Sequence, residues 1–144
     1  MEREDKFQTW LIEMDPALDR FVKSLPNPIA MDYSIASLGL LEDFLIKKYP
    51  DAKSALLPSE GEIVDGAARY LGEVFRVRLG GGSWFIDYRD EKNAYFGLPQ
   101  LRDVPGQKVQ ICPHTLVTTA IDRRTGTFLA NIFFNLKKNI DRVS

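Results

Sequence analysis

Apolar residues recur at spacings of three and four over residues 7–25, which predicts a helical face that packs on a core. Asp15 and Pro16 interrupt this pattern, and they suit the N-cap and the first position of a helix. We therefore expect two short helices, or one helix that is kinked at this point. Pro26 and Pro28 end the region, because proline cannot continue a helix.

Two longer helices are predicted next. The first begins near Ser34 and ends before Pro50. The second opens with Ser59 and Glu62, which form a capping box in which each side chain satisfies an exposed backbone amide of the first turn. The glycines at 80–82 stop this helix, since glycine adopts the left-handed cap conformation without a steric penalty.

After these glycines the apolar period changes to two, which indicates β-strands. Strands are expected at 83–88, 94–98 and 108–112, followed by a helix that opens at Pro113 and, after Gly126, by a last helix. Because helices and strands are segregated along the chain, the pattern predicts an α+β fold. It has N-terminal helices, a short three-stranded antiparallel meander and C-terminal helices.

Length and composition fit a single folded domain over residues 1–144. The mass is 16.4 kDa, with 44% hydrophobic and 27% charged residues, which is ordinary for a globular protein and excludes disordered and low-complexity classes. Cys112 is the single cysteine, so an intramolecular disulfide and a four-cysteine zinc site are excluded.

The charge balance bears on the partner and the location. The chain has 19 basic and 20 acidic residues and a net charge of -1. Nucleic-acid binders usually carry a basic excess, because neutralisation of phosphates dominates their affinity, so we expect no nucleic-acid partner. The charged N-terminal segment does not resemble a signal peptide, and no stretch reaches the ~18 apolar residues of a membrane helix. We therefore expect a cytoplasmic protein without membrane contact.

Few groups suit catalysis. His114 is the single histidine, which excludes a multi-histidine metal site. Cys112 would need this imidazole within hydrogen-bond reach to act as a nucleophile, and a serine hydrolase would need it too, although no Gly-x-Ser-x-Gly motif occurs. We expect no catalytic residue, no metal and no cofactor, with a local hydrogen bond for His114.

Gly72 lies inside a predicted helix, where a glycine costs about 1 kcal/mol relative to alanine. This indicates that another backbone or a large ring lies close, and Trp84 is a candidate. The neighbouring Glu73 has Arg69 and Arg76 within reach on the helix surface. The spacing predicts either a solvated row of ion pairs or a carboxylate fixed at the helix–sheet junction, where it contacts a partner.

Aromatic residues gather on the first two predicted strands. One strand face must cover the helices, and an aromatic on the other face is a typical anchor of a protein interface. The aromatic residues are Trp84, Phe85, Tyr88, Tyr95 and Phe96. The binding residues that we expect are Glu73, Arg76, Trp84, Tyr95 and His114.

Four short motifs occur together: Asp32-Tyr33-Ser34, Tyr70-Leu71-Gly72-Glu73-Val74, Gly81-Gly82 with Trp84, and Pro113-His114-Thr115-Leu116-Val117. Over roughly residues 32–121 the chain thus resembles small uncharacterised bacterial domains that pair a Tyr-Leu-Gly-Glu helix with a Gly-Gly-x-Trp strand. Some such domains are similar to immunity proteins of bacterial toxin systems. The resemblance implies an intracellular bacterial α+β domain that binds a protein, and it transfers no catalytic residue.

The preferred hypothesis is a non-enzymatic protein-binding domain of the immunity type, which neutralises a cognate toxin by occluding its active site. A charged face with aromatic anchors would give steering and specificity. The alternative is a small-molecule-binding or catalytic domain with His114 in a cleft beside Glu73 or Cys112. A third hypothesis is a homo-oligomer, such as a homodimer, that forms through an exposed sheet edge.

Overall fold

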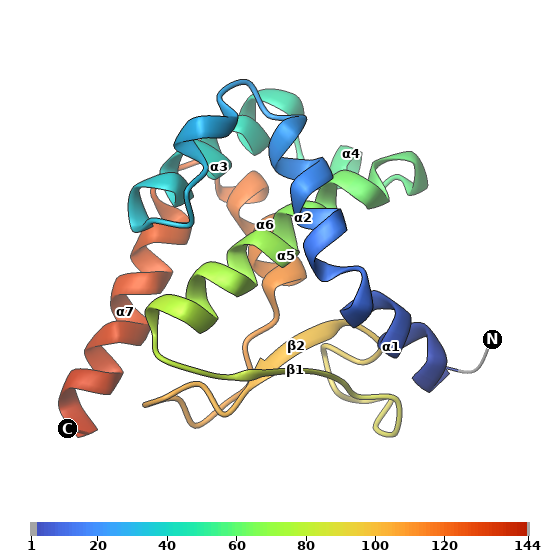
Figure 1. The fold of residues 1–144 in the computed structure, drawn as a ribbon, viewed down its shortest axis with the longest axis vertical. Helices are drawn as coiled ribbons and strands as arrows, with labels where there is room; N and C mark the ends of the chain where they lie inside the picture. The colour runs from blue at the N-terminus through green and yellow to red at the C-terminus, as the bar shows by residue number, and fades with distance from the viewer. Residues whose placement is uncertain (1–2, 144) are drawn as a thin grey trace.

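Helices make up most of the molecule, and a small sheet lies along one side of them (Figure 1). The computed structural model describes residues 3–143. The α-helices are α1 (Arg3–Ile12), α2 (Met14–Lys23), α3 (Ile35–Lys48), α4 (Ala52–Ala55), α5 (Gly61–Arg78), α6 (Pro113–Arg123) and α7 (Phe128–Val143). Short 3₁₀ turns occupy Pro28–Ala30 and Pro58–Glu60, and the strands are β1 (Ser83–Ile86) and β2 (Pro99–Arg102).

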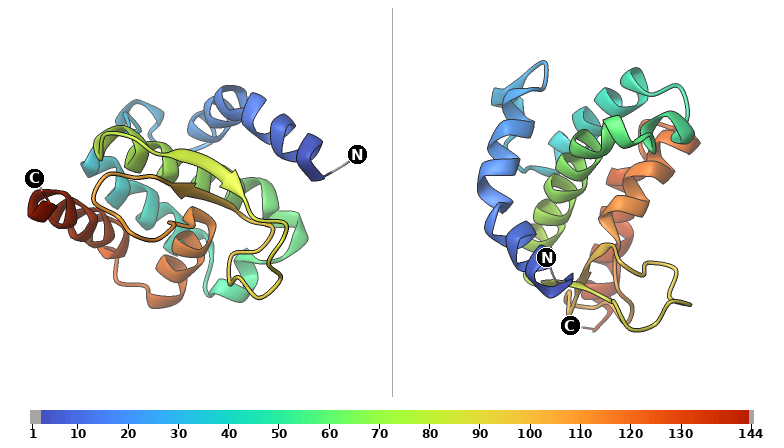
Figure 2. Two further views of the ribbon diagram at one scale, coloured as in Figure 1. Left: turned by 90° about the horizontal axis from the view of Figure 1, so that it is seen from below. Right: turned by 90° about the vertical axis from the view of Figure 1, so that its right-hand side faces the viewer.

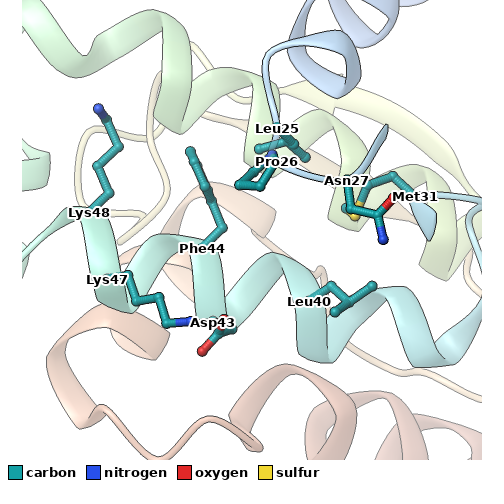
Figure 3. Close-up of a pocket in the computed structure, with 9 residues that line it drawn as sticks. All are labelled: Leu25, Pro26, Asn27, Met31, Leu40, Asp43, Phe44, Lys47 and Lys48. Carbon is teal, nitrogen blue, oxygen red and sulfur yellow. Dashed lines mark ion pairs between the residues drawn. The ribbon is translucent and has the colours of Figure 1, made fainter. Parts of the chain in front are cut away.

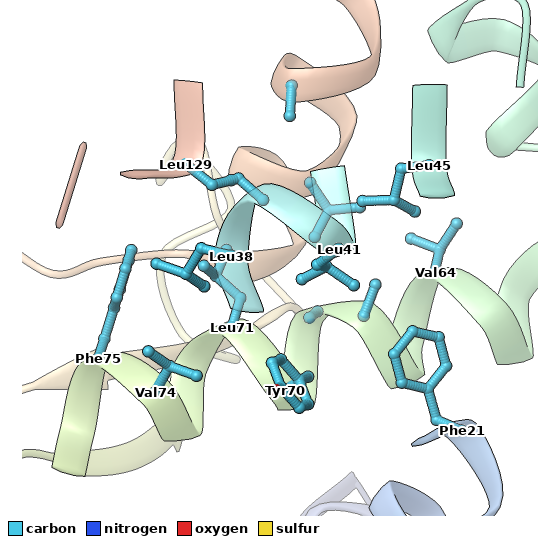
Figure 4. Packing of buried hydrophobic residues seen from close by; sticks show 14 of the residues in the cluster. Phe21, Leu38, Leu41, Leu45, Val64, Tyr70, Leu71, Val74, Phe75 and Leu129 are labelled. Carbon is cyan, nitrogen blue, oxygen red and sulfur yellow. The ribbon is translucent and has the colours of Figure 1, made fainter. Parts of the chain in front are cut away.

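Helix α5 is the central element of the core. It packs between α2 and α6, while α3 packs against α6 and α7. Leucines of α3 meet the apolar face of α5 in a continuous cluster of buried side chains (Figure 4). The polar tip of Tyr70 is satisfied inside this cluster, because its hydroxyl donates to Ser37 Oγ at 2.8 Å and accepts from the Tyr33 N–H at 2.9 Å.

Polar side chains fix the junctions between α3 and the C-terminal helices. The fully buried carboxylate of Glu42 accepts hydrogen bonds from the backbone N–H groups of Phe128 and Leu129, at 3.1 and 2.8 Å. At the C-terminal end of α3, the guanidinium of Arg124 donates to the carbonyl oxygens of Ile46 and Tyr49. Both contacts satisfy helix-terminal groups that have no partner within their own helix.

Helix boundaries are partly as predicted. The start of α3 is confirmed, because the Ser34 side chain caps it by accepting from the Ser37 N–H at 3.2 Å. The end of α5 before the glycines is also confirmed: Gly80 has a φ of 90°, and the Gly81 N–H donates to the Arg76 carbonyl. Two short N-terminal helices form as one of our two interpretations proposed, but they meet at Glu13.

The predicted caps at Asp15 and Ser59 are wrong. Asp15 lies inside α2, whose N-cap is Glu13, and Pro16 is tolerated there because the first-turn amides have no intrahelical acceptor. Ser59 belongs to a 3₁₀ turn, and its hydroxyl donates to Glu60, so no side chain caps α5.

The sheet corrects the predicted three-stranded meander, since two antiparallel strands form within residues 3–143. Residues 94–98 form turns instead of a strand, because the Asn93 side chain accepts from the Tyr95 N–H and Gly97 adopts a φ of 76°. Residues 108–112 contribute a single bridge, between Leu101 and Ile111, before Pro113 opens α6. The mixed helix-and-sheet class is confirmed.

Candidate functional site

Trp84 joins three elements at one point. Its ring lies against Gly72, where the Cβ of any other residue would collide with the indole, so the predicted reason for this glycine is confirmed. On another side the ring meets Trp10 edge-to-face, with 5.0 Å between centroids. Trp84 on β1 is thereby held against both α5 and α1, which fixes its orientation.

Glu73 is a fixed carboxylate at the helix–sheet junction. Its Oε2 accepts from Arg76 Nε at 2.8 Å and from Trp84 Nε1 at 3.4 Å. The Glu73 side chain is 16% exposed, whereas that of Arg76 is 40% exposed. Arg69, the other predicted neighbour, instead points to Asp65. Glu73 is therefore fixed at the helix–sheet junction, as one of the two interpretations of the spacing expected, and does not belong to a solvated row of ion pairs.

A partly buried polar cluster surrounds Asp65 on α5. Its Oδ1 accepts from Trp10 Nε1 at 2.9 Å and lies 3.0 Å from His114 Nε2, while its Oδ2 accepts from Arg69 Nε at 2.7 Å. Burial alone would raise the pKa of Asp65, but the hydrogen bonds from His114, Arg69 and Trp10 outweigh it and lower the pKa to about 2. Asp65 is therefore ionised at neutral pH.

Arg69 completes this cluster and ties it to α1. Its side chain is 3% exposed, and its Nη1 donates to the Trp10 carbonyl at 2.7 Å. The guanidinium also stacks over the Trp10 ring, 4.1 Å from the centroid. Sequence reasoning missed Asp65 and Trp10. The i,i+4 spacing of Asp65 and Arg69 was a usable signal, whereas the contacts with Trp10 cross more than 50 residues.

His114 does not make the local hydrogen bond that we expected. It lies in the first turn of α6, 15% exposed, and binds Asp65 from a position 49 residues away. Cys112 is buried; its sulfur accepts from the Thr115 hydroxyl at 3.3 Å and lies 3.8 Å from the Pro99 carbonyl oxygen. The structure therefore does not bring His114 and Cys112 together as a dyad.

Two adjoining hollows lie between α1 and β1, and both are lined by Leu11 and Trp84. One, of about 480 Å³, also contains Glu73 and Arg76; the other, of about 710 Å³, extends along β1 to Arg89. We call the two together the α1–β1 groove. Its walls come from α1 (Glu4, Phe7, Gln8, Leu11 and Ile12), the start of α2 (Met14 and Asp15), α5 (Glu73 and Arg76), residues 82–89 and Arg102 of β2.

The groove gathers three of the five expected binding residues, namely Glu73, Arg76 and Trp84. His114 lines neither of its hollows. Tyr95 lies in the turn after β1, where its carbonyl accepts from Gln100 Nε2 at 3.1 Å. Across residues 3–143, no hydrogen bond or ring contact connects Tyr95 to the other four.

A second surface hollow, of about 400 Å³, lies between α3 and the segment that connects it to α2 (Figure 3). We call it the α2–α3 groove. Apolar side chains line most of it, and Lys47 at one end pairs with Asp43 at 2.9 Å. None of the expected binding residues lies in it. Its apolar lining consists of Leu25, Pro26, Met31, Leu40 and Phe44.

Comparison with known proteins gives no relative. Neither the models of protein families, nor the curated proteins, nor the solved structures contain a match to this chain. Among residues 3–143, no group of three or more His, Cys, Asp or Glu side chains is placed to hold a metal ion. In the same part of the chain, no helix has the length and apolar character needed to cross a membrane.

Proposed function

We propose that this chain is a non-enzymatic protein-binding domain of the immunity type, which occludes the active site of a cognate bacterial toxin. The α1–β1 groove is the observation that carries the proposal. It is an open surface in which Trp84, held by Trp10, lines both hollows and the Glu73–Arg76 ion pair lines one of them. Interfaces draw most of their binding energy from such aromatic and arginine anchors.

Two cation–π pairs add further aromatic and arginine side chains to the surface around the groove. Arg102 lies over the Phe85 ring, 5.1 Å from its centroid, and Arg3 lies over the Tyr88 ring at 5.4 Å. Aromatic residues and arginine are enriched at protein interfaces, and mixed charge around them steers and selects the partner. The complex we propose forms in the cytoplasm and requires no cofactor, and the net charge of -1 argues against a nucleic-acid partner.

The alternative, a small-molecule-binding or catalytic domain, has one observation in its favour. Asp65, the partner of His114, also lines a hollow of about 210 Å³ beside the groove. His114 itself does not line that hollow, and its Nε2 would have to leave Asp65 to meet a ligand. The His114 Nε2 and the Cys112 sulfur contact internal partners, and the His114 Nδ1 is buried without a hydrogen-bond partner among residues 3–143. Because none of these atoms faces an open hollow, the binding function is better supported than the catalytic one.

Capture experiments with matched variants test the proposal. Gln8→Trp places a large side chain in the α1–β1 groove from an exposed position of α1, and Leu40→Trp does the same in the α2–α3 groove. We expect the full chain and Leu40→Trp to capture one partner from cells of the encoding organism. We expect Gln8→Trp to bind the purified partner about tenfold more weakly, because it fills the occupied surface.

Growth assays complete this test. Co-expression with the captured partner should protect the host cell from its toxicity, and Gln8→Trp should protect less than Leu40→Trp. Absence of a captured partner, equal binding by the two variants, or a partner that is harmless to the cell would each contradict the proposal.

A further inference from the structure

The hydrogen bonds of β2 reveal how its backbone is oriented. Leu101 and Ile111 exchange two backbone hydrogen bonds, at 2.8 and 3.0 Å, so the N–H and C=O of Leu101 face away from β1. Backbone groups of successive residues in a strand point to opposite sides. Gln100 and Arg102, on either side of Leu101, therefore direct their backbone groups toward β1.

Four backbone groups of β1 consequently point away from β2. The register places Ser83 and Phe85 opposite residues 102 and 100, so these two form the ladder, whereas Trp84 and Ile86 present N–H and C=O to the other side. Pro99 agrees with this assignment, because it lies opposite Ile86 and has no N–H to donate. Across residues 3–143, none of the four groups makes a hydrogen bond to another protein atom.

This free edge opens into the α1–β1 groove. Figure 2, left, shows β1 between α1 on one side and β2 on the other, and Trp84 and Ile86 both line the groove. A row of unpaired backbone donors and acceptors is a template for another strand. Building on the proposed function, we propose that an extended segment of the partner adds to β1 as a further strand and bonds to Trp84 and Ile86.

The position of α1 favours an extended segment of a partner over a second copy of this chain as the added strand. The groove is bounded by α1 on the side where a new strand would lie, and the Trp10 ring of α1 is in contact with Trp84. In a symmetric pairing of two β1 edges, both copies of α1 would lie along the joining line and would obstruct each other. A single extended loop or tail of a partner fits this geometry better than the sheet edge of a second copy.

Substitutions at Ile86 separate strand addition from side-chain contacts. Ile86→Pro removes the N–H that faces the groove, and it breaks no ladder bond because Ile86 faces away from β2. Ile86→Ala shortens the side chain to a similar degree but keeps the N–H. We would select binders to the full chain from a library of random linear peptides and measure the affinity of the best peptides for both variants.

We expect selected peptides that alternate apolar and polar residues, and an affinity about tenfold lower for Ile86→Pro than for Ile86→Ala. If Ile86→Pro does not fold, amide exchange in the unsubstituted chain replaces it, and the peptide should then protect the amides of Trp84 and Ile86. Failure to select any peptide, equal affinity for the two variants, or unchanged exchange at both amides overturns strand addition.

The outcomes also separate this inference from the function on which it rests. If a native partner binds Ile86→Pro as well as it binds Ile86→Ala, strand addition is wrong while protein binding stands. If peptides pair with the edge but no native partner is captured, strand addition stands while the proposed function fails.

Discussion

Two helical glycines show that the effect of an added methyl group on stability depends on its surroundings. A Cβ on Gly72 would collide with Trp84, whereas a Cβ on Gly39 in α3 would have no atom within 4 Å beyond the backbone of its own helix and its chain neighbours, among the described residues. We expect Gly72→Ala to lower the free energy of unfolding by about 1–2 kcal/mol, because overpacking outweighs the gain in helix propensity. Gly39→Ala should raise it by about 0.5–1 kcal/mol. Urea denaturation measures both, and a stabilised Gly72→Ala would contradict the packing described for Trp84.

Asp65 makes the stability of the fold depend on pH. Its pKa is about 2 in the folded chain against 3.8 without the fold, so the unfolded state takes up the proton first as the pH falls. The contribution is therefore fully present above about pH 5 and is lost toward pH 2, and it amounts to about 2 kcal/mol.

Asp65→Asn tests this dependence. The variant should be less stable at pH 7, because Arg69 remains buried without an ionised partner. Its unfolding free energy should change by about 2 kcal/mol less between pH 5 and pH 2 than that of the unsubstituted chain. Parallel curves from denaturation at a series of pH values would show that Asp65 does not carry the effect.

Residue contacts were predictable where the reason was local. Because a glycine inside a helix is unfavourable, Gly72 predicted a close neighbour, and this neighbour is Trp84, 12 residues later in the sequence. The contact between His114 and Asp65 had no such signal, since one side chain lies on α6 and the other on α5 and the packing of the two helices brings them together.

Among the elements, α7 depends on a carboxylate from α3. Glu42 accepts from two backbone N–H groups at the start of α7 while it is fully buried. Glu42→Gln loses the charge and one acceptor, so we expect the unfolding free energy to fall by about 2 kcal/mol. Asp43→Asn, at the adjacent and more exposed carboxylate, should change it by at most about 0.5 kcal/mol. Equal effects of the two substitutions in urea denaturation would exclude a capping role for Glu42.

Elements were predicted well where their ends are set within a few residues. Ser34 and the glycines at 80–82 gave correct ends for α3 and α5, because caps act over one turn. The prediction of a strand at 94–98 was wrong, because side-chain hydrogen bonds of Asp87 and Asn93 hold this segment in turns. Alternation of polar and apolar residues does not distinguish a strand from such a loop when both are half-buried.

At the scale of the whole molecule, the α1–β1 groove arises from segments more than 70 residues apart. The sequence placed Glu73, Arg76 and Trp84 among the binding residues from their chemistry, and the fold brings all three to one surface. The sequence did not indicate that α1 forms the opposite wall of the groove. Asp65 and Arg69 hold α1 in place through tertiary contacts with Trp10, and no local pattern predicts such contacts.

Amide hydrogen exchange of the free protein tests most directly whether β1 has an open edge that faces this groove. Exchange should alternate along the strand: it should be slow at Phe85, whose N–H bonds to β2, and fast at Trp84 and Ile86, whose N–H groups have no acceptor within residues 3–143. Equally slow exchange at all three amides would mean that the edge is already paired or covered, and it would contradict the binding surface proposed for this chain.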